Sequence, residues 1–139
     1  MKLFDPHIHM VSRTTDDYEQ LAKYGCVAVS EPAFWAGFDR GSVDGFRDYF
    51  RQLTEFEQKR SGWYGIQHFT WLCINAKEAE NVRLSREVIA MIPEFLAHPG
   101  VLGIGEIGLN KNTRNESIVF LEHLGLAART SESILIHTP

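Results

Sequence analysis

The sequence of 139 residues has the composition of an ordinary globular protein, with 44% hydrophobic and 23% charged side chains and a formal net charge of −4. These values exclude long disordered or low-complexity segments, and the acidic balance excludes nucleic-acid binding through general positive charge. The two cysteines supply neither a disulfide framework nor a four-cysteine zinc site. Because no apolar stretch has the length of a signal peptide or a membrane span, we predict a soluble, cytoplasmic, single-domain protein over residues 1–139, with no membrane partner.

Apolar stretches and helical patterns alternate along the chain. A first strand is expected over residues 2–9 and a helix over 16–24, followed by a strand (26–31) and helix (43–59), a strand (68–75) and helix (78–97), a strand (101–108) and helix (117–129), and a last strand (133–138). In the third helix, Pro93 should interrupt the helical hydrogen bonds near Ile92. Strand and helix repeat about every 30 residues, which predicts βαβ units and a parallel sheet.

The predicted strands favour an α/β fold whose sheet is covered on both faces or closed into a barrel. Residues 27–29 and 134–136 are continuously apolar, as in buried parallel strands. A complete (β/α)8 barrel needs about 250 residues. Five strands and four helices therefore predict an incomplete barrel, which either belongs to a longer protein or is completed by another chain.

Side chains that can bind a metal ion occur where the predicted strands end. His7 and His9 are two residues apart, so they would point the same way from a strand and could share one ion. Glu106 lies in an apolar, glycine-flanked strand, where a carboxylate must be paired or bound. His137 ends the fifth strand. Because barrel enzymes place their sites at the carboxyl ends of their strands, the pattern predicts a metal centre there.

Two further carboxylates have open roles. Asp5 lies one alternation below His7 and could orient a ligating histidine, or it could bond to the backbone before Pro6. Glu31 ends the second strand and could be either an additional ligand or a salt-bridge partner.

Three segments resemble the TatD-type metal-dependent hydrolases (TatD-related deoxyribonucleases) of the amidohydrolase superfamily. They are DPHIH at residues 5–9, GIGEIG at 103–108 and IHTP at 136–139, and their order matches along the whole chain. The resemblance implies the first five strands and four helices of a TIM-type (β/α)8 barrel. It also implies one or two divalent ions (Zn, Mg or Mn), held by His7, His9, Glu106 and His137.

The same resemblance implies that the site is partial. The family takes a further histidine and an aspartate, the expected catalytic base, from its sixth and eighth strands, so the base is absent from this chain. Asn75 stands where many relatives have histidine and Asn110 where aspartate is common, which indicates a divergent branch of the family.

Cations in the loops after the strands suggest an anionic substrate. They are Arg13, Arg40, Lys77, Lys111 and Arg114, and the alternative is that these charges are simply solvated. Phe34 and Trp35 could stack on a base, and the alternative for them is ordinary aromatic packing. We therefore predict a hydrolase that uses a metal-activated water on a phosphodiester, as a deoxyribonuclease does, or on a related ester or amide. Its partner would be a small anionic substrate or a nucleic-acid end. The alternative is a catalytically incomplete half-barrel, a subunit or binding module that needs a second half from a homodimer or another chain.

Overall fold

The computed structural model describes residues 1–137 and forms a single parallel sheet with helices between its strands. Thr138 and Pro139, which end the predicted fifth strand and its motif, lie outside the described residues. In chain order the elements are β1 (Leu3–Asp5), the 3-10 turn η1 (Met10–Ser12), α1 (Thr15–Lys23), β2 (Cys26–Pro32), α2 (Val43–Arg51), the π-helical segment η2 (Gln52–Phe56), α3 (Glu57–Gly62), β3 (Gln67–Leu72), the 3-10 turn η3 (Ala76–Glu78), α4 (Val82–Met91), α5 (Pro93–Leu96), β4 (Val101–Gly108), α6 (Arg114–Thr130) and β5 (Ser133–His137).

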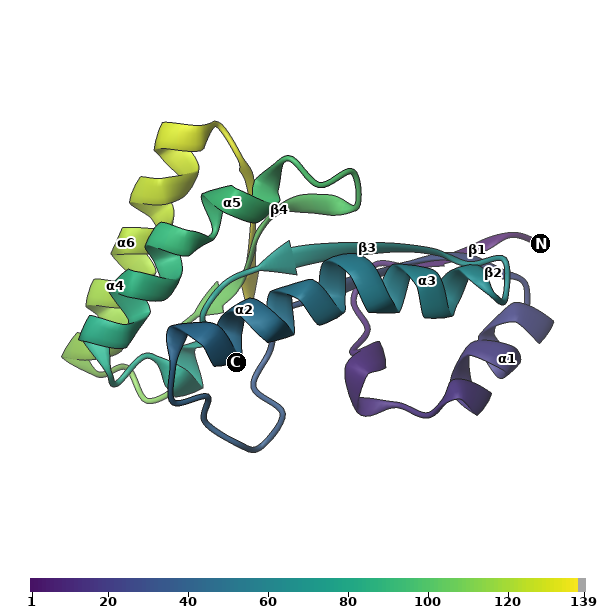
Figure 1. Ribbon diagram of the computed structural model, residues 1–139, viewed down its shortest axis with the longest axis horizontal. Coiled ribbons are helices and arrows are strands. Elements are labelled where there is room, and N and C mark those ends of the chain that lie inside the picture. Colours follow the sequence, from purple (N-terminus) through teal and green to yellow (C-terminus); the bar gives the residue numbers. More distant parts are fainter. Residues whose placement is uncertain (138–139) are drawn as a thin grey trace.

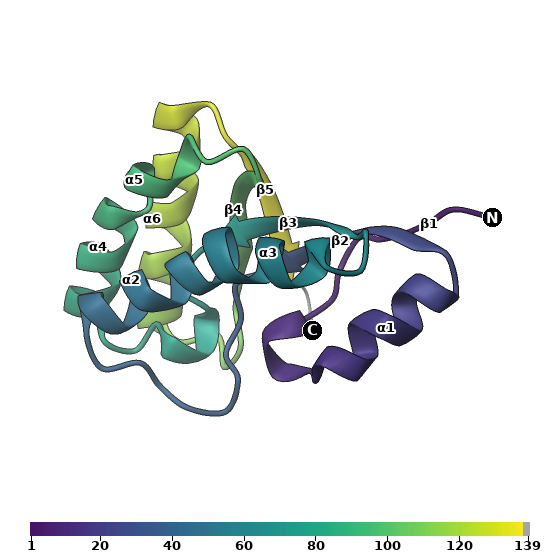
Figure 2. The same ribbon diagram turned by 45° about the vertical axis from the view of Figure 1, so that its right-hand side comes forward.

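The five strands lie in the order β1-β2-β3-β4-β5, and every neighbouring pair is parallel. Strands that follow one another along the chain are therefore neighbours in the sheet, which is the arrangement of successive βα units. Figures 1 and 2 show the sheet curling, with α4 and α6 side by side beyond β4 and β5, and α1 at the opposite end beside β1. The prediction of an α/β half-barrel with five strands is confirmed.

The predicted helices exist, but their details differ. The helix expected over 43–59 is a continuous run of α2, η2 and α3, in which the Thr54 hydroxyl donates to the Phe50 carbonyl oxygen at 2.8 Å within the wider π-helical turn. Pro93 begins α5 directly after Ile92, as expected. The last helix begins earlier than predicted, at Arg114, because the Thr113 side chain caps it by accepting the Glu116 N–H.

The first strand is shorter than predicted, and the error concerns the histidines. β1 ends at Asp5 instead of continuing to His9. Pro6 has no N–H to donate to a strand partner, and the Asp5 side chain accepts the His7 N–H at 3.0 Å, so the chain bends after Asp5. Pairing with β2 resumes once, where the Ile8 N–H donates to the Ser30 carbonyl at 3.0 Å.

Two groups of buried apolar side chains hold the helices on the sheet. The larger lies around Phe46, Phe50, Leu72 and Ile104, and the smaller contains Met10, Tyr18, Val29 and Ile66 beside α1. Several strand residues remain exposed instead, among them Phe4, Ile134 and Ile136. Among residues 1–137, every helix is too short or too polar to span a bilayer.

Glycines of β4 allow β5 to approach its backbone closely. A Cβ atom on Gly103 would lie 2.3 Å from the Ser133 carbonyl oxygen, and one on Gly108 would lie 2.3 Å from that of His137. Both contacts are far below van der Waals distance. The glycine-rich sequence of β4 thus sets the spacing between the strands that carry Glu106 and His137.

Candidate metal centre

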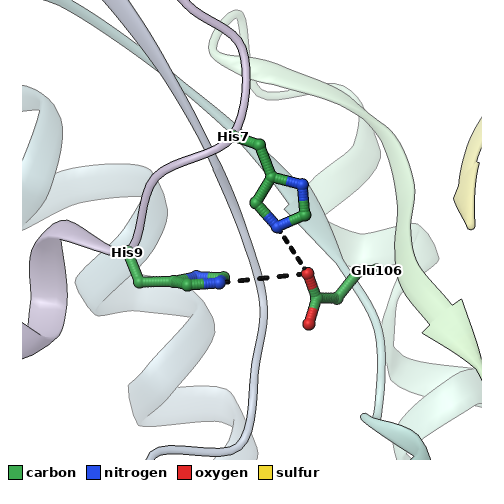
Figure 3. A group of neighbouring side chains, drawn as sticks. All are labelled: His7, His9 and Glu106. Carbon is green, nitrogen blue, oxygen red and sulfur yellow. Dashed lines mark ion pairs between the residues drawn. The ribbon is translucent and has the colours of Figure 1, made fainter. Parts of the chain in front are cut away.

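Three segments distant in the sequence bring polar side chains to the carboxyl-terminal edge of the sheet. Glu106 projects from β4 and is 5% exposed. His7 and His9 lie on the segment between β1 and η1, not on the strand as expected, and both point at the Glu106 carboxylate (Figure 3). His137 comes from the end of β5.

The distances within this group are short. Glu106 Oε2 lies 2.7 Å from His7 Nε2, 3.9 Å from His9 Nε2 and 3.6 Å from His137 Nδ1. One donor atom each from His7, His9 and Glu106 falls within 4.8 Å of the others. The four side chains expected to share a metal centre are thus brought together.

The chemistry of these donors fits a divalent ion. Glu106 Oε2 is buried and accepts no hydrogen bond within the part of the chain that the structure describes. Burial is the main reason why the pKa of His9 lies below its usual value, although Glu106 opposes the shift. A neutral imidazole keeps a nitrogen lone pair for a metal, and Phe34 stacks on the His9 ring at 3.9 Å between centroids, which fixes its plane. A buried carboxylate oxygen that faces the imidazole nitrogens of three histidines is an arrangement that a cation would complete.

Two residues that follow β3 contact Glu106. The Asn75 side-chain amide donates to Glu106 Oε1 at 3.4 Å, and the Cys73 thiol donates to the Glu106 carbonyl oxygen at 2.9 Å. Burial raises the pKa of Cys73 well above its usual value, so the thiol keeps the proton that it donates. From the sequence, Cys73 was assigned no role and Asn75 was treated only as a departure from the family. Their position at the end of a strand was the signal that could have found them.

The open alternatives for Asp5 and Glu31 now have structural answers. Asp5 binds the backbone N–H of His7, which is the backbone-bonded alternative. Glu31 is fully buried and pairs with His68, at 2.7 Å between Oε2 and Nε2, which is the salt-bridge alternative. The buried His68 is thus the partner of Glu31.

Only some of the cations predicted to lie near the site border its cavities. Lys77 lines a cavity of about 220 Å³ that Glu106 and His137 also border, and its ammonium lies 4.7 Å from the centre of the Trp35 ring. Lys111 lines an adjoining cavity that shares Trp35 and Lys77. Within the described part of the chain, neither Arg13 nor Arg114 lines these two cavities. The Arg13 guanidinium lies 3.9 Å from the Asp17 carboxylate. Arg114 was expected in a loop but is the first residue of α6.

Arg40 is engaged elsewhere, although the sequence placed it among the site cations. Its guanidinium pairs with the buried Glu78 at 2.9 Å and lies 3.7 Å from the centre of the Tyr49 ring. The two aromatic residues expected near the site do lie there. Phe34 and Trp35 both line the 220 Å³ cavity, and the Trp35 indole N–H donates to Asp39 at 2.6 Å.

Comparison with known proteins finds similarity to proteins named as metal-dependent hydrolases. Over 137 residues, the chain is 27% identical to an uncharacterized metal-dependent hydrolase of Methanocaldococcus jannaschii, a match covering 99% of this chain and 53% of the relative. It is 26% identical over 143 residues to the uncharacterized metal-dependent hydrolase YabD of Bacillus subtilis, covering 97% and 50%. The chain spans about half the length of the curated relatives it matches. No protein-family model matches it.

A solved structure gives the same result for the fold. The crystal structure of a TatD-like protein from Archaeoglobus fulgidus superposes with a TM-score of 0.86 at 28% identity, over 99% of this chain and 56% of that protein. The resemblance to TatD-like metal-dependent hydrolases and the incomplete barrel are therefore both confirmed.

Proposed function

We propose that this chain provides the metal-binding part of a TatD-like hydrolase that cleaves a phosphodiester, or a related ester or amide, with a metal-activated water. One observation supports this most strongly. Three segments distant in the sequence meet at one buried oxygen of the Glu106 carboxylate. The segment with His7 and His9 and the strand end with His137 both bring imidazole nitrogens to that oxygen. The similarity to proteins named metal-dependent hydrolases agrees with that reading.

In this proposal His7, His9 and Glu106 hold one divalent ion, and His137 contributes to the same ion or to a second one. When bound, such an ion lowers the pKa of a water molecule and polarises the oxygen of the bond to be cleaved. Two imidazoles and a carboxylate favour Zn²⁺ over Mg²⁺, which prefers oxygen ligands and water. We therefore propose Zn²⁺ as the first ion to test, with Mn²⁺ and Mg²⁺ beside it.

The cavity beside Glu106 supports a small anionic substrate or the end of a nucleic acid. Lys77 has no carboxylate within ion-pair distance among the described residues, so its charge is available to a phosphoryl group. The neighbouring acids Asp39 and Glu80 instead accept hydrogen bonds, from the Trp35 indole and from the Thr113 hydroxyl. Trp35 lines the same cavity and supplies an aromatic ring for a planar group.

Metal binding by the Glu106→Ala variant tests the proposed centre. The protein is loaded with Zn²⁺, dialysed and measured for bound metal by mass spectrometry, with Glu94→Ala as control because Glu94 is an exposed carboxylate paired with Arg47. We expect bound zinc in wild type and the control, and a loss of about tenfold or more in affinity for Glu106→Ala. Equal zinc content in all three proteins would refute the role of Glu106.

Substrate class is tested with the same preparation. Hydrolysis of bis-nitrophenyl phosphate, compared with a panel of esters and amides, separates the phosphodiester proposal from the amide alternative. Zinc binding without turnover of any substrate supports the other alternative, a half-barrel that needs a second half for activity.

A further inference from the structure

A group of buried polar side chains lies behind the histidine segment, between the sheet and the helices α1 and α3. We call it the buried ion cluster, and it consists of Tyr18, Glu31, Glu57, Arg60 and His68. None of its side chains is in the proposed metal centre.

The cluster holds the backbone that immediately follows His9. Glu31 Oε1 accepts the Val11 N–H at 2.8 Å. The Arg60 guanidinium donates to the Met10 carbonyl at 2.6 Å and to the Arg13 carbonyl at 3.3 Å. Residues 10–13 are thus bound from two sides by charged groups that come from β2 and α3.

Both holding groups are themselves fixed. Glu31 Oε2 contacts His68 Nε2 at 2.7 Å, and both side chains are fully buried. Arg60 binds Glu57 Oε2 through its Nε–H at 3.0 Å, and its guanidinium lies over the Tyr18 ring at 4.9 Å. The Tyr18 hydroxyl also donates to Glu57 at 2.9 Å, so neither charge can turn away without breaking other contacts.

Stability alone is a weak reason for this arrangement. Removing charges from water costs about as much as their attraction returns, and apolar side chains of similar volume often serve a core as well or better. The cluster does provide fixed anchors where strand pairing has stopped, since the histidine segment leaves the strand after Asp5, and its next backbone bond to β2 is the one from Ile8 to Ser30.

We propose that the buried ion cluster is the positioning device of the metal centre. Glu31 and Arg60 fix residues 10–13, and through them they fix the direction in which His7 and His9 face Glu106. Ligand groups must be held to within about 0.5 Å for productive metal binding, which a free loop would not achieve. This inference rests on the proposed metal-binding function.

The test compares zinc affinity in variants that keep or remove these anchors. Arg60→Lys keeps the charge beside Glu57 but lacks the planar fork that reaches Met10 and Arg13. Glu31→Ala removes the acceptor of the Val11 N–H, whereas Glu31→Gln keeps an acceptor for Val11 and can donate to His68. Arg51→Lys is the matched control, an arginine in the same helical run that is exposed and pairs only with neighbours in that run.

Zinc dissociation constants are measured by competition with a chromophoric chelator well below the unfolding temperature of each variant. We expect affinity to fall about tenfold in Arg60→Lys and Glu31→Ala, and to stay within about twofold of wild type in Glu31→Gln and Arg51→Lys. In the metal-free protein, the ring signals of His7 and His9 in NMR spectra should shift in Arg60→Lys and not in Arg51→Lys.

A purely structural role gives a different result. The unfolding midpoints of Arg60→Lys and Glu31→Ala would then fall while zinc affinity and the His7 and His9 signals stayed as in wild type, and this would overturn the inference. If Glu31→Ala does not fold, Arg60→Lys decides the matter. If wild type itself binds no zinc, the proposed function fails, and the histidine signals of Arg60→Lys still test the positioning.

Discussion

The side chain of Asn75 is held at both ends. Its carbonyl oxygen accepts the Lys77 N–H at 3.1 Å, which turns the NH₂ group toward Glu106 Oε1 at 3.4 Å. Oε1 is therefore occupied, and Oε2 is the oxygen left facing the histidines. At the scale of single residues, this amide orients the carboxylate.

The variant Asn75→Leu removes the donor while keeping a side chain of similar size. We expect it to weaken zinc binding about tenfold, because the Glu106 carboxylate is then free to rotate. A competition titration measures the change, with Asn115→Leu as control, since Asn115 binds Glu80 instead of Glu106. Equal affinities for Asn75→Leu and wild type would show that Asn75 does not orient Glu106.

His123 links stability to pH. It is buried in α6, accepts the Ile74 N–H at Nε2 (3.2 Å) and contacts the Val119 carbonyl through Nδ1 (2.9 Å), and burial lowers its pKa to about 4. Between pH 6.5 and pH 4 the unfolded chain binds a proton that the folded chain does not. We therefore expect full stability above about pH 6.5 and a progressive loss of about 3 kcal/mol as the pH falls to 4.

Urea unfolding at several pH values measures this loss. The variant His123→Gln, which can still accept the Ile74 N–H, should be less stable at neutral pH but show a flatter dependence below pH 6.5. His98→Gln serves as the control, because His98 is only half-buried. An unchanged pH dependence in His123→Gln would contradict the assignment.

The four residues expected to bind a metal, which the structure brings together, could be singled out from the sequence because each is a polar group within or beside an apolar stretch. His7 and His9 were found for a partly wrong reason, since a bend after Asp5, and not strand alternation, turns them inward. Asn75 and Cys73 were not assigned, although both follow the end of a strand, because an amide and a thiol carry no charge that burial would make conspicuous. The partner of Glu31 depends on strand register, which the sequence does not reveal.

At the scale of elements, the helices and strands could be predicted from the periodicity of apolar residues and from proline and capping residues at their ends. Pro93 marks a real boundary, whereas Thr113 was not recognised as the cap that starts α6 at Arg114. The π-helical segment Gln52–Phe56 was not predicted, because its apolar spacing also fits a regular helix. Proline before the histidines explains why β1 is short, a signal that was present in the sequence but was not applied.

The contact between β4 and β5 depends on glycine. We expect Gly103→Ala to cost about 2 kcal/mol or more, because its Cβ would meet the Ser133 carbonyl oxygen at 2.3 Å and neither backbone can withdraw without losing strand pairing. Gly62→Ala is the control, since nothing lies within 4 Å of the added Cβ in α3. Thermal and urea unfolding should show a stable control and a destabilised Gly103→Ala, and equal stabilities would contradict the packing argument.

At the scale of the whole molecule, β1 and β5 each pair on one side only among the described residues. Ile134 and Ile136 of β5 are 38% and 51% exposed. Exposed strand edges with apolar side chains favour association with another strand. These edges support the proposal that another segment or a second chain, in a homodimer or as a separate second half, covers this part of the sheet.

We expect the 139-residue chain to self-associate as its concentration rises, and Ile134→Lys to reduce that association by placing a charge at the edge of β5. Light scattering across a range of concentrations measures it. Leu121→Lys on α6 is the control, because Leu121 is also exposed but lies on a helix. A wild-type chain that remains monomeric throughout would count against an interacting edge.

The large sequence distance between the histidine segment and Glu106 has a consequence for folding kinetics. The two ends of this roughly hundred-residue loop meet only after the intervening strands and helices have docked, so the ligand set is assembled late. An ion captured there would act on the native state and hardly at all on the transition state for folding. A bound ion would therefore slow the unfolding of the molecule without increasing its folding rate.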